Sequence, residues 1–170
     1  LGLQVFEGER DLAIAKKAMA WTEILPLAER SIDELSGGER KRVFIAKALA
    51  QEPEVILLDE PTANLDIHHQ IEFLDLILGL NRGKGLTILM ATHDINLASE
   101  FCDRLILLRQ GGIFKTGLPA EVITEENMGQ VYGCEVWVGK HPVSGMPRVS
   151  LLKKGIQEDG TLERDRKSKD

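Results

Sequence analysis

Cysteines and long hydrophobic runs are scarce in this sequence. The two cysteines, Cys102 and Cys134, lack the paired spacing of a metal-binding motif, so we interpret them as reduced thiols of a cytosolic protein. The longest apolar runs, such as Leu105 to Leu108, are far shorter than the roughly 18 residues of a membrane span. The sequence therefore predicts neither a disulfide framework nor a membrane-spanning helix.

Positive charge and aromatic residues are also in short supply. The chain carries 21 Lys and Arg residues against 27 Asp and Glu residues, which gives a net charge of −6 and an isoelectric point near 5.3. This balance gives no electrostatic reason to expect a general nucleic-acid binder. The two tryptophans, Trp21 and Trp137, are isolated and form no series on which bases would stack. We therefore expect no nucleic-acid partner.

What is present is the composition of a folded domain. Over 170 residues, 43% are apolar and 28% are charged, which is ordinary for one globular domain with a hydrophobic core. The first residue is Leu1 rather than methionine, and the chain begins in what reads as the middle of a domain, so we expect a fragment. Residues 153–170 include 11 charged ones and are expected to be disordered.

Two strands of continuous apolarity form the expected centre of the fold. Val55–Asp59 and Thr87–Ala91 are β-rich runs without alternation, which predicts parallel strands buried on both faces. The 27 residues between them are ample for a right-handed crossover through a helix over 67–80, which the glycines in 79–85 are expected to break. The other expected elements are helices over 9–23, 38–51 and 94–101, a helical turn over 26–30, a hairpin turning at 110–112, short helices over 119–123 and 125–132, and short strands over 135–138 and 148–151.

The segment Leu35–Glu39, with the sequence LSGGE, is the first candidate site. Ser36 and Glu39 have the spacing of a capping box, in which the serine hydroxyl accepts from a backbone N–H three residues on and the glutamate reaches back. A capping box does not explain two consecutive glycines, Gly37 and Gly38, which cost conformational entropy. Glycines let a ligand approach the backbone, and a helix N-terminus with free N–H groups binds phosphate. Capping and phosphate binding are compatible, and both stay open on this segment alone.

Two adjacent carboxylates, Asp59 and Glu60, follow the first apolar strand in the sequence VILLDEP. One interpretation is a core strand that runs into a solvated acidic turn. However, the carboxyl end of a buried parallel strand is where open α/β sheets place ligand chemistry. There Asp59 has the hard oxygen atoms that Mg²⁺ prefers, and Glu60 has a carboxylate that could polarise a water for attack on phosphorus.

The second apolar strand is followed by Thr92-His93-Asp94. Thr92 or Asp94 has the side chain to cap the next helix, and a single histidine at a strand end is more often structural than catalytic. In this chain, however, His93 follows a strand next to the one that ends at Asp59. Its imidazole could therefore contact a terminal phosphate from the same edge of the sheet.

The remaining clusters of basic residues are interpreted as solvated helix faces. His68 and His69 lack a second histidine four residues on and do not suggest a metal site. The basic residues after LSGGE are expected to face water, although some of them could aid phosphate binding; they are Arg40, Lys41, Arg42 and Lys47.

Taken in order, these segments resemble the ATPase subunits of ATP-binding cassette (ABC) transporters. LSGGE is similar to the family's signature, VILLDEP to Walker B, Ala63–Asp66 to the D-loop and Thr92–Asp94 to the switch segment, in the family's order and spacing. The resemblance covers Arg10 to Gly117 and implies an α/β fold, the P-loop NTPase-like ABC ATPase fold, here incomplete. Its expected parts are a helical subdomain with the signature helix over 1–52, the C-terminal part of the ATPase core over 53–152 and the charged tail over 153–170.

The resemblance also implies a role for each candidate residue. The signature residues would contact ATP bound mainly by a partner subunit; they are Ser36, Gly37, Gly38 and Glu39. Asp59 would serve Mg²⁺, and Glu60 would be the catalytic base. Asp66 would cross the dimer interface as part of the nucleotide site, and His93 would hold the γ-phosphate.

The cofactors implied in this way are ATP and Mg²⁺. The implied partners are a second ATPase subunit, which would form a homodimer, and integral-membrane permease subunits. The expected location is peripheral, on the cytoplasmic face of the plasma membrane.

One departure from the family pattern is large and one is minor. Family members carry a Gly-rich Walker A loop and then a glutamine loop upstream of the signature, and no G-x-x-x-x-G-K-[ST] occurs in these 170 residues. Glu39 stands where the family often has glutamine, which is the minor difference.

The C-terminal part narrows the class. Val131–Gly133 and His141–Pro147 are similar to the tail of ATPases that energise uptake of iron–siderophore, haem or vitamin B12 complexes, although a loop rich in Pro and Gly would look much the same. Two other interpretations stay open. A DNA-repair or chromosome-maintenance ATPase would predict heptad segments, zinc-binding cysteines or basic surfaces, none of which the sequence has. A non-catalytic truncated remnant would keep fold elements without turnover.

Overall fold

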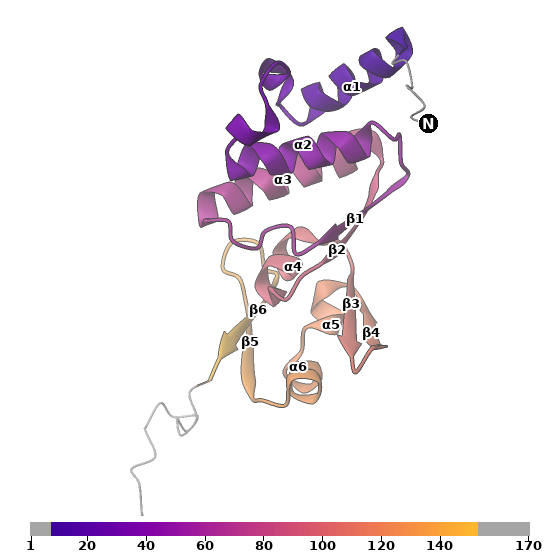
Figure 1. Cartoon of the computed structure of the whole chain (residues 1–170). Coiled ribbons are helices and arrows are strands. Elements are labelled where there is room, and N and C mark those ends of the chain that lie inside the picture. The colour runs from indigo at the N-terminus through magenta and orange to yellow at the C-terminus, as the bar shows by residue number, and fades with distance from the viewer. Residues whose placement is uncertain (1–7, 153–170) are drawn as a thin grey trace, which may run out of the picture. The chain divides into compact units, whose positions relative to one another are not determined.

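The chain divides into two compact units, Leu1–Thr92 and His93–Asp170, in the computed structural model. The structure describes residues 8–152, and the tail over 153–170 that is expected to be disordered lies outside them. Figure 1 shows the helices and strands of both units. In the described part of the chain, no helix combines the length and the apolarity that crossing a membrane requires.

The first unit joins a group of helices to two parallel strands. β1 and β2 pair from Val55 opposite Thr87 to Asp59 opposite Ala91, and α3 forms the connection between them (Figure 1). The predicted parallel pair and its helical crossover are confirmed. The elements are α1 (Glu9–Trp21), the 3-10 helices η1 (Leu25–Leu27) and η2 (Ile32–Glu34), α2 (Gly37–Leu49), β1 (Val55–Asp59), α3 (Ile67–Lys84) and β2 (Thr87–Ala91).

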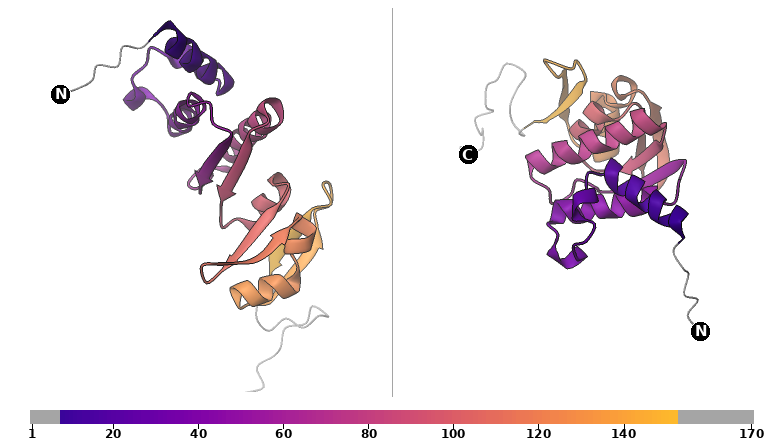
Figure 2. Two further views of the ribbon diagram at one scale, coloured as in Figure 1. Left: turned by 90° about the vertical axis from the view of Figure 1, so that its right-hand side faces the viewer. Right: turned by 90° about the horizontal axis from the view of Figure 1, so that it is seen from above.

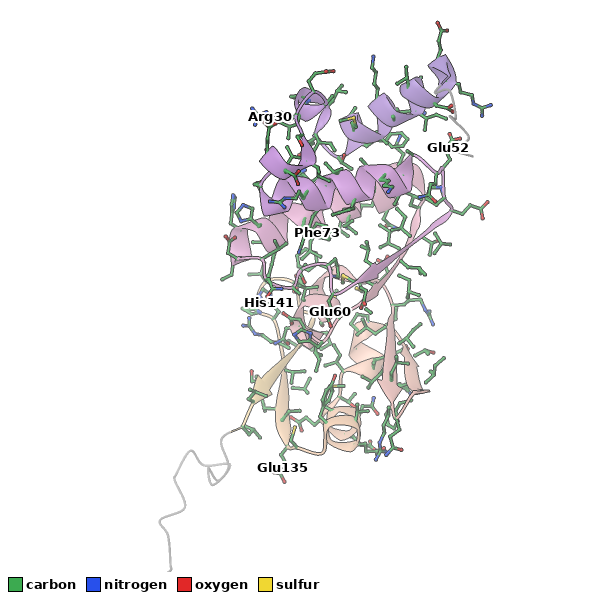
Figure 3. All side chains as sticks on the ribbon, in the orientation of Figure 1. Arg30, Glu52, Glu60, Phe73, Glu135 and His141 are labelled. Atoms are coloured by element: carbon green, nitrogen blue, oxygen red, sulfur yellow. The ribbon has the colours of Figure 1, made fainter. Side chains whose placement is uncertain are left out.

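The core of this unit lies between the helices and one face of the strand pair (Figure 2). Leu57 and Leu89, on the opposite face, are 72% and 51% exposed. The prediction that the strands are buried on both faces is therefore wrong for this chain, because its described helices cover only the side that carries Ile56. The buried cluster consists of Ala18, Ile24, Ile45, Ala46, Leu49, Ile56, Phe73 (labelled in Figure 3), Ile77, Leu80 and Leu86.

Helix α3 is longer than the sequence predicts. It continues through Gly79 and Gly83 to Lys84, and it ends at Gly85, whose φ of 66° is left-handed. A glycine inside a helix costs only about 1 kcal/mol, less than the burial of one large apolar side chain such as Leu80 contributes. The prediction that Gly79 and Gly83 break the helix is therefore wrong, and only Gly85, where a positive φ is needed, ends it.

The second unit is built on two antiparallel hairpins. β3 pairs with β4 around Gln110 and Gly111, whose φ values of 50° and 78° suit a tight hairpin turn, so the predicted hairpin is confirmed. The two short strands predicted near the C-terminus form the second hairpin. The elements are α4 (Ile95–Phe101), β3 (Leu105–Arg109), β4 (Gly112–Gly117), α5 (Pro119–Val122), α6 (Glu125–Tyr132), β5 (Val136–Lys140) and β6 (Pro147–Leu151).

Helix α4, which follows His93, is fastened to the last strand by its own side chains. Asn96 pairs with the backbone of Val149 in both directions: Nδ2 donates to the carbonyl at 3.1 Å, and Oδ1 accepts from the N–H at 2.8 Å. The buried Ser99 donates its hydroxyl to the carbonyl of Pro147 at 2.6 Å. The C-terminal hairpin is therefore hydrogen-bonded to α4, the first helix of this unit.

Candidate functional site

The N-terminus of α2 is capped by the two residues that the sequence indicates. Ser36 Oγ accepts a hydrogen bond from Glu39 N at 3.2 Å, and Glu39 Oε2 accepts one from Ser36 N at 2.7 Å. Hydrogen bonding of the Glu39 carboxyl to Ser36, first to its backbone N–H and then to its hydroxyl, holds the pKa of this carboxyl below its ordinary value. The predicted capping box is confirmed.

The two glycines of this helix start have no structural cause within the described chain. A Cβ on Gly37 would meet no atom within 4 Å, and a Cβ on Gly38 would make only an ordinary contact, 3.7 Å from Cδ2 of His69. Neither glycine has the positive φ that would require it. Turn geometry and packing within the described chain therefore do not repay the entropy that these glycines cost.

The two predicted carboxylates lie at the carboxyl end of β1. Glu60 N donates to the carbonyl of Ala91 at 2.9 Å and so closes the ladder between the strands. Asp59 is exposed and Glu60 is half-buried, at the position labelled in Figure 3. Glu60 has a φ of 43°, a left-handed conformation that is uncommon for a residue with a side chain.

Lys41 on the signature helix reaches the segment that follows Glu60. Its Nζ donates to the carbonyl of Pro61 at 2.8 Å and to the carbonyl of Ala63 at 3.1 Å. Burial lowers the pKa of this ammonium below its ordinary value. The prediction that Lys41 belongs to a solvated face is therefore wrong, and the missed signal is that Lys41 stands four and eight residues before the buried Ile45 and Leu49, on the same helix face.

Two neighbouring arginines also have specific partners. Arg40 Nε donates to the carbonyl of Leu35 at 2.9 Å, and Arg42 forms an ion pair of 2.8 Å with Glu23. Arg40 and Lys47 are exposed, as predicted, and Arg42 is half-buried. Lys41 and Arg42 therefore fasten this helix to other segments of the first unit.

Asp66 caps α3 and holds a histidine. Its Oδ1 accepts from His69 N at 2.9 Å, and its two carboxylate oxygens lie 2.8 and 2.9 Å from His69 Nδ1. These hydrogen bonds, first from the backbone and then from the ring, lower the pKa of Asp66. The same ring lies 3.7 Å from the place where a Cβ on Gly38 would stand, so the starts of α2 and α3 are close together. The sequence predicted neither of these contacts of His69.

The switch segment spans the boundary at which the first unit ends with Thr92 and the second begins with His93. Asp94 caps α4, with Oδ1 accepting from Leu97 N at 2.9 Å, so of the two capping candidates Asp94 is the one that the structure shows. His93 stands two positions after Ala91, the partner of Asp59 in the parallel ladder. Its predicted contact with a γ-phosphate stays a prediction.

Two cavities of the first unit lie around Trp21, away from the motifs. Their volumes are about 450 and 380 Å³, and both are bordered by Lys84, whose Nζ lies 3.1 Å from the centre of the indole ring. None of the motif residues of the first unit lines either cavity. The candidate site is thus separate from these two cavities.

Comparison with known proteins identifies this arrangement. The family model for the ABC transporter matches residues 2–63. The ferric enterobactin transport ATP-binding protein FepC of Escherichia coli (strain K12) is 45% identical over 144 residues, which cover 85% of this chain and 53% of that protein. The iron(3+)-hydroxamate import ATP-binding protein FhuC of Bacillus subtilis (strain 168) is 43% identical over 139 residues, covering 82% of this chain and 52% of that protein.

A third curated relative is less similar in sequence. The cobalamin import ATP-binding protein BtuD of Halobacterium salinarum is 39% identical over 147 residues, covering 86% of this chain and 37% of that protein. The chain thus spans about half the length, or less, of these curated relatives.

Among solved structures, a metal-chelate type ABC transporter in an inward-facing conformation has a TM-score of 0.80 at 27% identity, over 91% of this chain and 62% of that one. The ATP-binding cassette MJ1267 in its ADP conformation has a TM-score of 0.69 at 27% identity, over 79% of this chain and 54% of that one. Sequence, fold and the order of the motifs therefore agree, and the chain belongs to the ABC transporter family, with part of the α/β ATPase fold of its ATP-binding proteins.

Proposed function

We propose that this chain supplies the signature, Walker B, D-loop and switch residues of an ATPase that powers a membrane importer. The observation that carries the proposal is the start of α2, where two glycines without a packing role leave the backbone N–H groups open to an anion. The same unit places two carboxylates at the carboxyl end of β1. An ATPase needs both a phosphate site and carboxylates to act at it.

Each residue has a proposed role in hydrolysis. Ser36, Gly37, Gly38 and Glu39 contact the terminal phosphate of ATP held by a second copy of the protein. Glu60 accepts the proton of the water that attacks the γ-phosphorus, and the imidazole of His93 donates a hydrogen bond to the γ-phosphate. Asp66 crosses the interface between the two copies.

Asp59 is the proposed contact for Mg²⁺. Nucleotide-bound Mg²⁺ keeps most of its ligands as water and phosphate oxygens and needs only one or two carboxylates from the protein. An exposed carboxylate at a strand end meets this need, and among residues 8–152 no cluster of three or more His, Cys, Asp or Glu side chains offers a closed metal site. When bound, the ion neutralises phosphate charge.

The proposed partners are a second ATPase subunit and the permease of an importer, on the cytoplasmic side of the membrane. The relatives named for ferric enterobactin, iron hydroxamate and cobalamin support a metal chelate or a corrinoid as the cargo. Growth on limiting iron chelate or vitamin B12 after gene deletion tests the cargo. A defect confined to sugar or amino-acid uptake would reject the cargo and leave the ATPase proposal standing.

Residues 1–170 by themselves are expected not to hydrolyse ATP. They contain no P-loop, which would supply several backbone N–H donors and a lysine to the β- and γ-phosphates. The expected affinity for Mg-ATP is no better than roughly millimolar. Titration of the purified chain with Mg-ATP and a phosphate-release assay test this, and micromolar binding with steady turnover would contradict it.

The catalytic assignment is tested in an ATPase chain in which a P-loop segment precedes these residues. Glu60→Gln should abolish hydrolysis and leave ATP binding largely intact, because the charge orients the attacking water and does not hold the nucleotide. Normal turnover in this variant would overturn the role of Glu60. Absence of turnover in the parent ATPase would instead favour the non-catalytic remnant.

A further inference from the structure

We propose that Lys41 is a positioning residue that links the signature helix to the segment between Glu60 and Asp66. Through this link, an anion bound at the start of α2 changes the geometry of the Glu60 and Asp66 carboxylates in the same chain. The inference rests on the proposed function, because it assumes that α2 binds a phosphate. It adds a residue that the motifs do not contain.

The position of Lys41 in α2 makes it sensitive to the phosphate site. It stands one helical turn after Gly37 and Gly38, the two residues whose backbone is open to a ligand. A helix turn is a rigid unit, so a shift of the helix start on anion binding is transmitted to the backbone of residue 41. Its long side chain then carries the shift to the ammonium group.

The other end of the link is the chain directly after the proposed catalytic base. The ammonium is shared between the carbonyls of Pro61 and Ala63, at 2.8 and 3.1 Å. The carbonyl between them belongs to the buried Thr62 and accepts from Gln70 Nε2 of α3 at 3.4 Å. Three successive carbonyls are therefore held by side chains of two helices, and the charged donor among them is Lys41.

The held segment is bracketed by two strained residues. Glu60 has a φ of 43° and Asn64 has a φ of 61°, and left-handed backbone at residues with side chains persists only where the surroundings hold it. Releasing the carbonyls at 61 and 63 removes one of the contacts that hold both residues. The side chain of Glu60 and the cap at Asp66 lie at the two ends of this segment, so both would move.

A second contact points in the same direction. The ring of His69, which is fixed by the carboxylate of Asp66, lies in van der Waals contact distance of a Cβ placed on Gly38. The signature helix therefore reaches the segment after Glu60 through Lys41, and its start lies close to the start of the helix that Asp66 caps.

The test compares three variants in an ATPase chain in which a P-loop segment precedes these residues. Lys41→Met removes the ammonium and keeps the unbranched stem, Lys41→Arg keeps donors and charge, and Lys47→Met is the matched control on an exposed position of the same helix. Lys41→Met should lower kcat by about tenfold with little change in KM for ATP, because it displaces a reacting group without touching the nucleotide. Lys41→Arg should recover most of the loss, and Lys47→Met should match the parent.

Hydrogen exchange supplies a readout that does not depend on turnover. With Glu60→Gln added to stop hydrolysis, Mg-ATP should slow exchange of the amides over 62–66 in the parent and in Lys47→Met, and should change it little in Lys41→Met. If Lys41→Met does not fold, Lys41→Gln, which retains one amide donor, replaces it and should show an intermediate response.

The outcomes separate the two proposals. A folded Lys41 variant with parental kcat and the parental response of residues 62–66 to ATP would overturn the role of Lys41 and leave the ATPase proposal intact. A parent protein that hydrolyses no ATP would overturn the proposed function, and this inference would fall with it.

Discussion

The starts of α2 and α3 are two helix N-termini that the same chain treats in opposite ways. Both are capped by an oxygen of the residue before the helix, Ser36 in one and Asp66 in the other. At α3 the ring of His69 covers the cap, and the carboxylate already carries the negative charge that a helix dipole favours. At α2 the next residue is Gly37, and nothing lies within 4 Å of the place where its side chain would be.

The difference shows that capping and ligand binding are separable demands. A cap satisfies one or two of the four free N–H groups of a helix start and leaves the rest to water or a ligand. Both caps accept from the N–H of the third helical residue, Glu39 in α2 and His69 in α3, and at α3 the carboxylate of the cap is also bonded by the His69 ring. The spacing S-x-x-E by itself predicts the cap. The two glycines within it predict that a ligand approaches the start of the helix.

Gly37→Glu should break the comparison most strongly, since it adds a second carboxylate beside that of Glu39 at the start of α2. In an ATPase that includes a P-loop, turnover should fall by about 100-fold, because a fixed negative charge replaces the approach path of a phosphate. Folding should not suffer, since the site has room for a side chain and an acidic residue suits a helix start. Steady-state kinetics beside urea unfolding measure both effects, and a loss of stability in step with activity would contradict the interpretation.

Ser36→Ala should lower the free energy of unfolding by about 1 kcal/mol, the usual cost of losing an N-cap. The carboxylate of Glu39 would keep its bond from the backbone N–H of residue 36, so the capping box would be half lost rather than abolished. Urea denaturation followed by circular dichroism measures the change. Ser36→Thr, which keeps the hydroxyl, is the control and should stay close to the parent.

Gly79→Ala is the matching test on α3, because this glycine lies in the interior of the helix and belongs to none of the proposed motifs. No atom lies within 4 Å of a Cβ placed there, so the substitution should stabilise the protein by up to about 1 kcal/mol without altering ATP turnover. A thermal melt detects the gain. Equal effects of Gly79→Ala and Gly37→Ala on turnover would show that the signature glycines have no special role.

The smallest expected effect is on the acid limb of stability. The pKa values of Glu39 and Asp66 are both lowered in the folded chain, so each carboxylate stabilises the fold above its unfolded pKa, near 4, and this contribution is lost as the pH falls through the lower folded pKa. Glu39→Gln and Asp66→Asn should each make the midpoint of urea unfolding less dependent on pH below about pH 5. Asp66 is exposed and Glu39 is partly exposed, so high salt should weaken the effect. A steeper acid limb in either variant would contradict the sign.

The strands and caps were predictable because their signals are local. Val55–Asp59 and Thr87–Ala91 have the predicted bounds, and the box at Ser36 forms as its spacing indicates. The exposure of Leu57 was not predictable from the sequence. A continuous apolar run shows that both faces of a strand are suited to burial, but it does not show whether this chain contains the helix that would cover each face.

The errors at α3 and Lys41 have a common cause, which is tertiary structure overriding a local rule. Glycine weakens a helix by a fixed amount, but the core around Phe73 and Leu80 contributes more. Lysine is usually solvated, but the carbonyls of Pro61 and Ala63 converge where its ammonium lies. Only a spatial arrangement brings residues 41 and 61–63 together.

The left-handed backbone at Glu60 has an evolutionary consequence. Glu52, which follows α2, shares this conformation with a φ of 52°, and at both positions glycine would relieve a backbone cost on the order of 1 kcal/mol. At residue 52, a change to glycine would only increase the stability of the fold. At residue 60 the same change would remove the carboxylate proposed to activate water, so selection for stability and selection for turnover oppose each other at this codon. A lineage released from the need to hydrolyse ATP should therefore lose its glutamate here early, and become more stable as it does.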